Sequence, residues 1–179
     1  YEENLYDMLI FARDEIISPL ENETISLKER ISLVVSYAFK IQFMMDNYQF
    51  DKTSIDSLCS AEETNCHIKD FLSSFTILEP IDDNWSAYLQ KLIDSSESLN
   101  KIAIDNKETD LYLKNIAVYF IWRYFLKGVY DEEILSKVVL MAISVAMIKL
   151  MYKNAALSEE SLCGDICSQL AKNYSKEIE

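Results

Sequence analysis

The sequence predicts an all-α protein. Only two of its 179 residues are Gly and two are Pro, whereas sheets and hairpins need frequent turn residues. Half of the residues are hydrophobic and eleven are Tyr, which argues against disorder. Apolar residues also recur at helical spacing along most of the chain. We expect a single domain, 1–179, that forms an irregular bundle of six or seven helices around a central antiparallel pair.

The first two helices are predicted at residues 2–18 and from Ser26 to about Asp46. The apolar stripe of the first comprises Leu5, Met8, Leu9, Ala12 and Ile16. Pro19 marks its end, because proline cannot continue a helix. Ser26 and Glu29 have the spacing of a capping box, which satisfies free amides at a helix start.

The middle of the chain predicts a polar loop at 47–60 and then a shorter helix. Ser60 and Glu63 repeat the spacing of a capping box before that helix, which runs to about Phe75.

Another helix is predicted from Asp83 or Asn84 through Ile93. It is extended to Ile104 only across a run of serines, which disfavours a helix interior.

The two most apolar segments, 111–127 and 132–154, predict the central pair. Gly128 suits a left-handed C-cap of the first, and Asp131 suits an N-cap of the second. Because the link is short, the two helices should pack antiparallel. Ser158 is expected to cap the last helix.

The charge pattern limits the partners. A net charge of −13 repels DNA, RNA and anionic membrane surfaces, so we expect no nucleic acid and no membrane partner. The acidity suits a lysine-bearing partner, although a solvated acidic surface is the favoured explanation. Ser136, Lys137, Ser144 and Lys149 interrupt the most apolar helix, which predicts a core helix rather than a membrane span.

The cysteines are candidate metal ligands. Cys59, Cys66 and His67 lie close in sequence, and Cys163 and Cys167 are one helical turn apart; thiolates and imidazole bind zinc or iron–sulfur clusters. There is no C-x-x-C pair, and free cysteine is often a small buried hydrophobe, so we predict no metal site. Four cysteines without a regular framework indicate a reducing compartment, the cytoplasm. His67 is the only histidine and has no evident catalytic partner.

Arg123 lies inside the apolar stretch 115–131, where a buried guanidinium needs a partner. Glu177, near the end of the chain, is the candidate. The structural interpretation is a buried ion pair that docks the last helix. The functional one is a grip on a substrate or cofactor carboxylate, and a third is that Arg123 reaches water.

Two segments carry a resemblance: NIAVYFIWRYFLKGVYDEEILSKVVLMAISVAMIKL followed by NYSKEIE, and LYDMLIFARDEIISPLENETISLKERISLVVSYAFKIQ. They resemble the C-terminal region of the flagellin lysine N-methylase family. The resemblance implies that this chain is a fragment of a longer protein whose cysteine-rich N-terminal half, its expected partner, is absent here.

The resemblance also implies a function. The full protein would transfer methyl groups from S-adenosylmethionine to lysine side chains of flagellin, with an iron–sulfur cluster as a further implied cofactor. This fragment would hold flagellin or support the reaction without catalysing it. The alternatives are a ligand-binding domain of an all-α bacterial transcription regulator, or a helical interaction module without a ligand.

Overall fold

The computed structural model describes residues 2–47, 67–79, 83–104, 106–158 and 164–178. These residues form helices and connecting turns, and no strand occurs among them, so the predicted all-α fold is confirmed. The chain divides into two compact units: residues 1–62 with 110–145, and residues 63–109 with 146–179. They are called unit 1 and unit 2 below.

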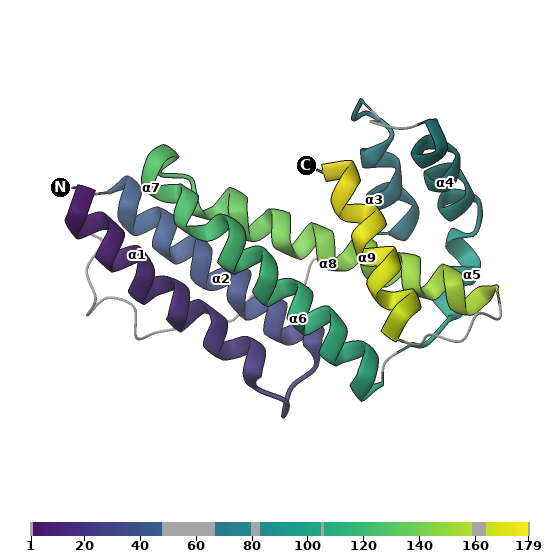
Figure 1. Ribbon diagram of the computed structural model, residues 1–179, viewed down its shortest axis with the longest axis horizontal. Coiled ribbons are helices and arrows are strands. Elements are labelled where there is room, and N and C mark those ends of the chain that lie inside the picture. Colours follow the sequence, from purple (N-terminus) through teal and green to yellow (C-terminus); the bar gives the residue numbers. More distant parts are fainter. Residues whose placement is uncertain (1, 48–66, 80–82, 105, 159–163, 179) are drawn as a thin grey trace. The chain divides into compact units, whose positions relative to one another are not determined.

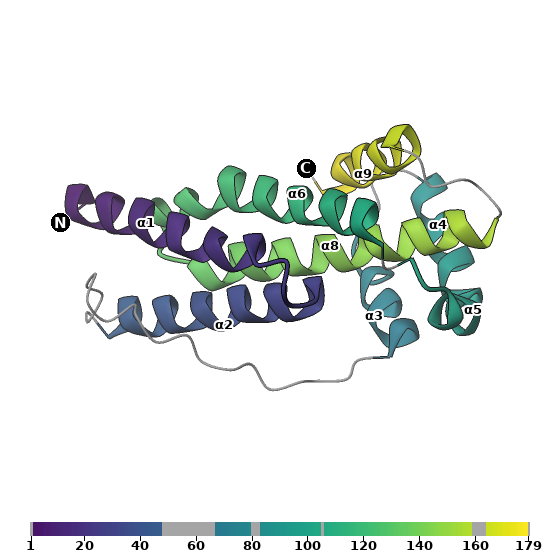
Figure 2. The ribbon, with the colours of Figure 1, turned by 90° about the horizontal axis from the view of Figure 1, so that it is seen from below.

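Unit 1 consists of long helices joined by short helical turns (Figures 1 and 2). Its elements are α1 (Glu2–Ile17), the 3-10 helix η1 (Ser18–Glu21), α2 (Leu27–Asp46), most of α6 (Lys107–Tyr124), the 3-10 helix η3 (Phe125–Lys127), α7 (Gly128–Asp131) and the first part of α8 (Ile134–Leu157). In both views α6 and the first part of α8 run side by side in opposite directions. α1 packs against α2, η3 and α7.

Aliphatic and aromatic side chains fill the interior of unit 1. Those that expose 2% of their surface or less include Leu9, Ile16, Leu20, Val34, Ile41, Leu113, Ile121, Phe125, Ile134 and Met141. Full burial of one such side chain stabilises the fold by roughly 1.5–3 kcal/mol, so this shared interior outweighs any single polar contact in the unit.

The start of α2 is the predicted capping box. The Ser26 backbone N–H donates to Glu29 Oε2 at 2.8 Å, and the Glu29 N–H donates to Ser26 Oγ at 3.3 Å. One turn on, the buried Arg30 donates from Nη1 to the Leu20 carbonyl oxygen at 3.0 Å, and its Nη2 lies 3.6 Å from Asp110 Oδ2. Arg30 thereby connects α2 to both η1 and α6.

The start of α8 is satisfied from a distant part of the sequence. Gln42 Oε1 in α2 accepts hydrogen bonds from the backbone N–H of Ile134 at 2.7 Å and of Leu135 at 3.2 Å. Its Nε2 donates to the Glu132 carbonyl oxygen at 2.9 Å and to Asp46 Oδ1 at 2.8 Å. The predicted N-cap Asp131 instead lies in α7, accepts from the Glu133 N–H and pairs with Lys137.

The two ends of α6 correct two expectations. Gly128 has φ −57°, so it is not a left-handed C-cap; the left-handed residue is Glu132, with φ 55°. Gly128 is needed for space, because a Cβ there would collide with the side chain of Ile134. α6 also begins at Lys107 rather than at 111, since Asn106 Oδ1 accepts from the Thr109 N–H at 2.9 Å and caps it.

Unit 2 is built from shorter helices and the second part of α8. Its other elements are α3 (Ile68–Phe75), α4 (Asp83–Asp94), α5 (Ser96–Lys101) and α9 (Gly164–Ile178). α3 packs against α4 and α5. Lys153 of α8 donates to the carbonyl oxygen of Leu99 in α5 at 3.0 Å, and the hydroxyl of Tyr152 donates to the carbonyl oxygen of Cys167 in α9 at 3.1 Å.

Three predicted boundaries in unit 2 fall elsewhere. α3 begins at Ile68, because His67 has an extended backbone; Ser60, Glu63 and the predicted loop at 47–60 lie almost wholly outside the described residues. The helix predicted from 83 onward is divided at Ser95. Ser158 donates to the Asn154 carbonyl oxygen and closes α8 instead of opening α9.

α8 is long and apolar enough to cross a membrane, and half of its most apolar window is buried inside the structure. One such helix is weak evidence for a span, because core helices of soluble proteins pass the same test. Apolar side chains of this helix that expose 1% or less include Val138, Met141, Met147 and Ile148.

We expect Gln42→Ala to lower the free energy of unfolding by about 1–2 kcal/mol, because α8 loses the acceptor for its first two amides. Gln90→Ala in α4 is the matched control, since Gln90 makes the same one-turn bond to Asp94 but no long-range bond among the described residues. Chemical unfolding followed by circular dichroism measures both. Equal losses in the two variants would contradict the assignment of Gln42.

The capping box should give a pH-dependent contribution. The hydroxyl of Ser26, and then its backbone N–H, hold the pKa of Glu29 below its ordinary value of 4.5. A lowered folded-state pKa stabilises the protein above the ordinary pKa, and that contribution disappears as pH falls through the folded-state pKa. The stability difference between the unmodified chain and Glu29→Gln should therefore shrink below pH 4.5. A difference that grows on acidification would refute this sign.

Candidate functional site

Arg123 is exposed rather than buried, which corrects the expectation of a guanidinium enclosed in the core. Its Nη1 donates to the hydroxyl of Tyr119 one turn earlier, at 2.7 Å. Its Cζ lies 5.8 Å from the ring centroid of Tyr119 and 5.6 Å from that of Tyr124. The side chain therefore reaches water while it contacts two phenol rings of its own helix.

The pairing of Arg123 with Glu177 stays a prediction. Glu177 lies within α9, but its side chain is outside the described part of the chain. Both interpretations of the pair, a docking contact for the last helix and a carboxylate grip, therefore remain proposals.

Arg13 is a buried cation of unit 1 that stacks on an aromatic ring. The sequence analysis did not single it out. Arg13 is 9% exposed. Its Nε and Nη2 donate to Asp14 Oδ1 at 3.0 and 2.8 Å, and its Cζ lies 3.7 Å from the ring centroid of Trp122 in α6. A guanidinium stacked this closely on an indole gains a cation–π attraction. The indole covers the guanidinium and is itself 53% exposed.

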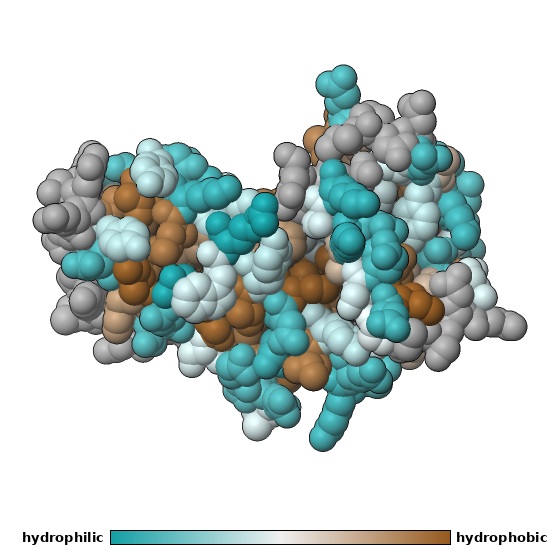
Figure 3. All heavy atoms as spheres, viewed as in Figure 1, coloured by the Kyte–Doolittle hydropathy of each residue, from teal (hydrophilic) through white to brown (hydrophobic). Residues whose placement is uncertain are grey.

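The aromatic residues of α6 and η3 cover more than one face. Phe120 and Phe125 are buried, whereas Tyr119 and Trp122 are 46% and 53% exposed. Figure 3 shows apolar side chains in brown beside paler aromatic ones on the face of unit 1 that carries α1 and α6.

One corner of unit 1, the acidic corner, gathers carboxylates and exposed rings. It comprises Asp46, Asp131, Glu132 and Glu133 with Phe43 and Tyr130. The Gln42 amide, which bonds both Asp46 and the backbone of Glu132, brings the end of α2 to the start of α8. The hydrogen bond from Lys137 lowers the pKa of Asp131, whereas Glu132 and Glu133 have no ion pair within the described residues.

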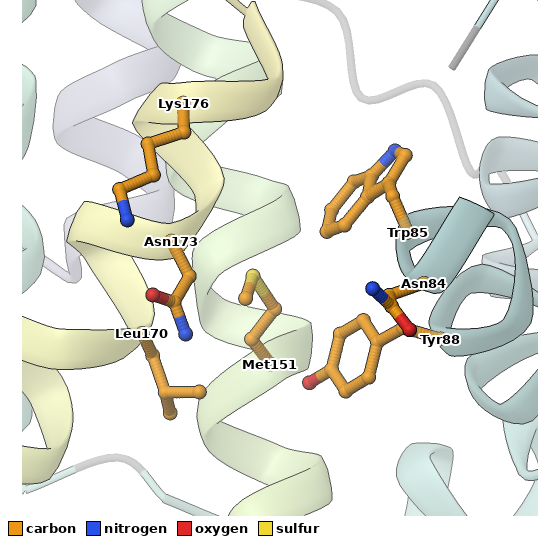
Figure 4. A pocket seen from close by; sticks show the side chains of 7 residues that line it. All are labelled: Asn84, Trp85, Tyr88, Met151, Leu170, Asn173 and Lys176. Carbon is orange, nitrogen blue, oxygen red and sulfur yellow. The ribbon is translucent and has the colours of Figure 1, made fainter. Parts of the chain in front are cut away.

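Unit 2 contains a pocket of about 400 Å³ between α4, α8 and α9 (Figure 4). This volume lies within the range of small-molecule sites. Asn84, Trp85 and Tyr88 of α4 form one wall, and Met151 of α8 lies between the walls.

The opposite wall comes from α9. Leu170, Asn173 and Lys176 line it at intervals of three residues, which places them on one face of the helix. The sequence did not predict this pocket, because α4 and α9 are separated by most of the second half of the chain.

The two walls differ in chemistry. The rings of Trp85 and Tyr88 are nearly parallel, with an interplanar angle of 27° and centroids 5.9 Å apart, and Trp85 also contacts the buried Tyr174. On α9, Asn173 Oδ1 accepts from Gln169 Nε2 at 2.7 Å, so the Asn173 amide nitrogen is the end turned toward the pocket in Figure 4. The α4 wall is thus flat and aromatic, and the α9 wall carries donors.

The cysteine positions give no described metal site. Cys59, Cys66 and Cys163 lie outside the described residues, and Cys167 is buried and forms no disulfide within them. His67 is exposed and directly precedes α3, and its side chain makes no capping hydrogen bond to that helix. Within the described ranges no group of three His, Cys, Asp or Glu residues could hold a metal ion.

We expect Trp122→Leu to destabilise the chain by about 1–2 kcal/mol, because the poorly solvated Arg13 loses its aromatic cover. Trp122→Phe should retain most of the stability, since a phenyl face remains. Tyr130→Leu is a control on a side chain that is 90% exposed. Unfolding is followed by circular dichroism. A loss in Trp122→Phe as large as in Trp122→Leu would contradict the stacking.

Comparison with known proteins gives one match. The family model described as the FliB lysine N-methylase C-terminal domain matches residues 13–179. A search of curated proteins found no match, and neither did a search of solved structures. The matched range covers η1 to α9 and the last five residues of α1, and overlaps both of the quoted segments. The chain belongs to the family of FliB lysine N-methylase C-terminal domains.

Proposed function

We propose that this chain is the part of a flagellin lysine N-methylase that holds the lysine-bearing substrate. The observation that carries the proposal is membership in the FliB C-terminal family. In the full protein, methyl groups would pass from S-adenosylmethionine to flagellin lysines. We assign that chemistry to a cysteine-rich N-terminal partner segment, which the resemblance implies. We expect the reaction to take place in the cytoplasm.

The acidic corner supports substrate binding by its charge. A lysine ammonium is attracted by carboxylates and by aromatic faces, and Glu132 and Glu133 present carboxylates beside the exposed ring of Tyr130. Lys137 of the chain itself forms an ion pair with Asp131, which shows that a lysine ammonium can reach a carboxylate of this corner. The net charge of −13 steers basic segments toward the chain more generally.

The packing of unit 1 favours a docking role over the regulator alternative. A regulator that encloses its ligand needs a cavity among its central helices. In unit 1 the inward side chains of α6 and α8, including Leu113, Ile121, Val138 and Met141, expose 2% or less. Large side chains instead face outward, with Phe39 62% and Phe43 57% exposed on α2, as expected for a surface that meets another segment.

We expect the chain to bind flagellin of the same organism at low ionic strength, and Glu132→Lys with Glu133→Lys to raise the dissociation constant about tenfold. Fluorescence anisotropy of labelled flagellin measures both. Acetylation of the flagellin lysines should abolish the interaction, because it removes the ammonium charge.

The matched control is Glu79→Lys with Glu97→Lys, which makes the same change of net charge at exposed sites in unit 2. It should weaken binding far less than the acidic-corner variant. Absence of flagellin binding at low salt would rule out the substrate-holding role. Equal weakening by the two variants would rule out the acidic corner as its location.

A further inference from the structure

We infer that the pocket between α4, α8 and α9 is a binding site for a small ligand that carries a flat aromatic ring and an anionic group. The inference is independent of the substrate-holding role. It rests on the opposed chemistry of the two walls within unit 2.

The α4 wall suits a planar ring. Trp85 and Tyr88 lie one turn apart, stack on each other and both line the pocket. An aromatic ligand can extend this stack on an outer ring face, as bases stack on aromatic side chains. Met151 adds a polarisable thioether, which makes favourable contacts with aromatic rings. Asn84, on the same wall, offers an amide to a polar ring edge.

The α9 wall suits an anion. Because the Asn173 oxygen is occupied by Gln169, the Asn173 nitrogen donates on the pocket side. Lys176, one turn later, lines the pocket, and in Figure 4 its ammonium lies on the α9 side, away from Trp85 and Tyr88, where the outer end of a stacked ligand would reach. The three N–H donors of an ammonium match phosphate or carboxylate oxygens. No carboxylate is among the described residues that line the pocket, in a chain whose net charge is −13.

The same lining fits S-adenosylmethionine poorly. That molecule carries a sulfonium and an ammonium against one carboxylate, so it is a net cation. The charged group of the lining is the cation Lys176, and like charges repel. Ribose hydroxyls and the ammonium would also find no carboxylate acceptor among the described lining residues. The pocket therefore suits a ligand other than the methyl donor of the family.

The ring and its anionic group have two chemical sources, a nucleotide or a simple aromatic acid. Adenosine 5′-monophosphate and phenyl phosphate represent them. Tighter binding of the nucleotide indicates that the amides of Asn84 and Asn173 contact the base or sugar. Equal binding indicates that the site takes aromatic anions in general. Either result supports the shared chemistry.

The chain allows a selective optical test, because it has only two tryptophans, Trp85 and Trp122. In a Trp122→Phe background, the remaining indole lies in the pocket. We expect adenosine 5′-monophosphate to quench its fluorescence saturably, and more tightly than uncharged adenosine or S-adenosylmethionine. Saturation-transfer NMR of the nucleotide ring protons on the unmodified chain gives a second reading that does not depend on any variant.

Lys176→Met should raise the dissociation constant of the nucleotide about fivefold and leave that of adenosine unchanged, as expected for loss of one exposed charge pair. The matched control is Lys172→Met, an exposed lysine one turn earlier on α9 that does not line the pocket. The assignment is overturned by absence of saturable quenching and of saturation transfer at 10 mM nucleotide, by tighter binding of S-adenosylmethionine, or by equal effects of the two lysine variants.

Discussion

The arrangement of unit 1 depends on how the first amides of α8 are satisfied. An α-helix leaves its first backbone N–H groups without partners, and here the amide of Gln42, about 90 residues earlier in the chain, accepts from two of them. The same amide donates to the carbonyl oxygen of Glu132, the left-handed residue that precedes the helix. Gly128 completes the reversal by leaving room for Ile134. A polar side chain of α2 therefore sets where the most apolar helix starts.

Local signals in the sequence were sufficient for the elements that depend on neighbours along the chain. The apolar stripe of α1 and the capping box of α2 each depend on residues within a few helical turns of one another. Both predictions are confirmed. The link between α6 and α8 was predicted with the wrong cap, because its two requirements come from distant side chains. Gln42 supplies the acceptor, and Ile134 supplies the steric demand on Gly128. Neither requirement has a local pattern.

Exposure in α6 could not be deduced from apolar content. Tyr and Trp count as hydrophobic, yet Tyr119 and Trp122 lie at the surface and carry cations on their faces. Arg123 is exposed in the same way, whereas Arg13, at the edge of the α1 stripe, and Arg30 of α2 have buried guanidinium groups. The pocket of unit 2 could not be predicted from the sequence either, because its lining residues in α4 and α9 are far apart in the chain and only the fold places them opposite each other. Carboxylates gather at one corner of unit 1, and donors line the pocket of unit 2. On the two proposals above, the chain offers separate surfaces to cationic and anionic groups.

Each compact unit is assembled from two stretches of chain, and α8 contributes to both. A single cut anywhere between the termini therefore leaves at least one unit without part of its helices, so neither unit is obtainable by simple truncation. Nucleating a helix is costly while extending it is not, so one initiation event at Ile134 supplies helical backbone to both units. Domain-dissection strategies that assume contiguous modules would fail here. Circular permutation would not help, because the four stretches alternate between the two units even when the termini are joined.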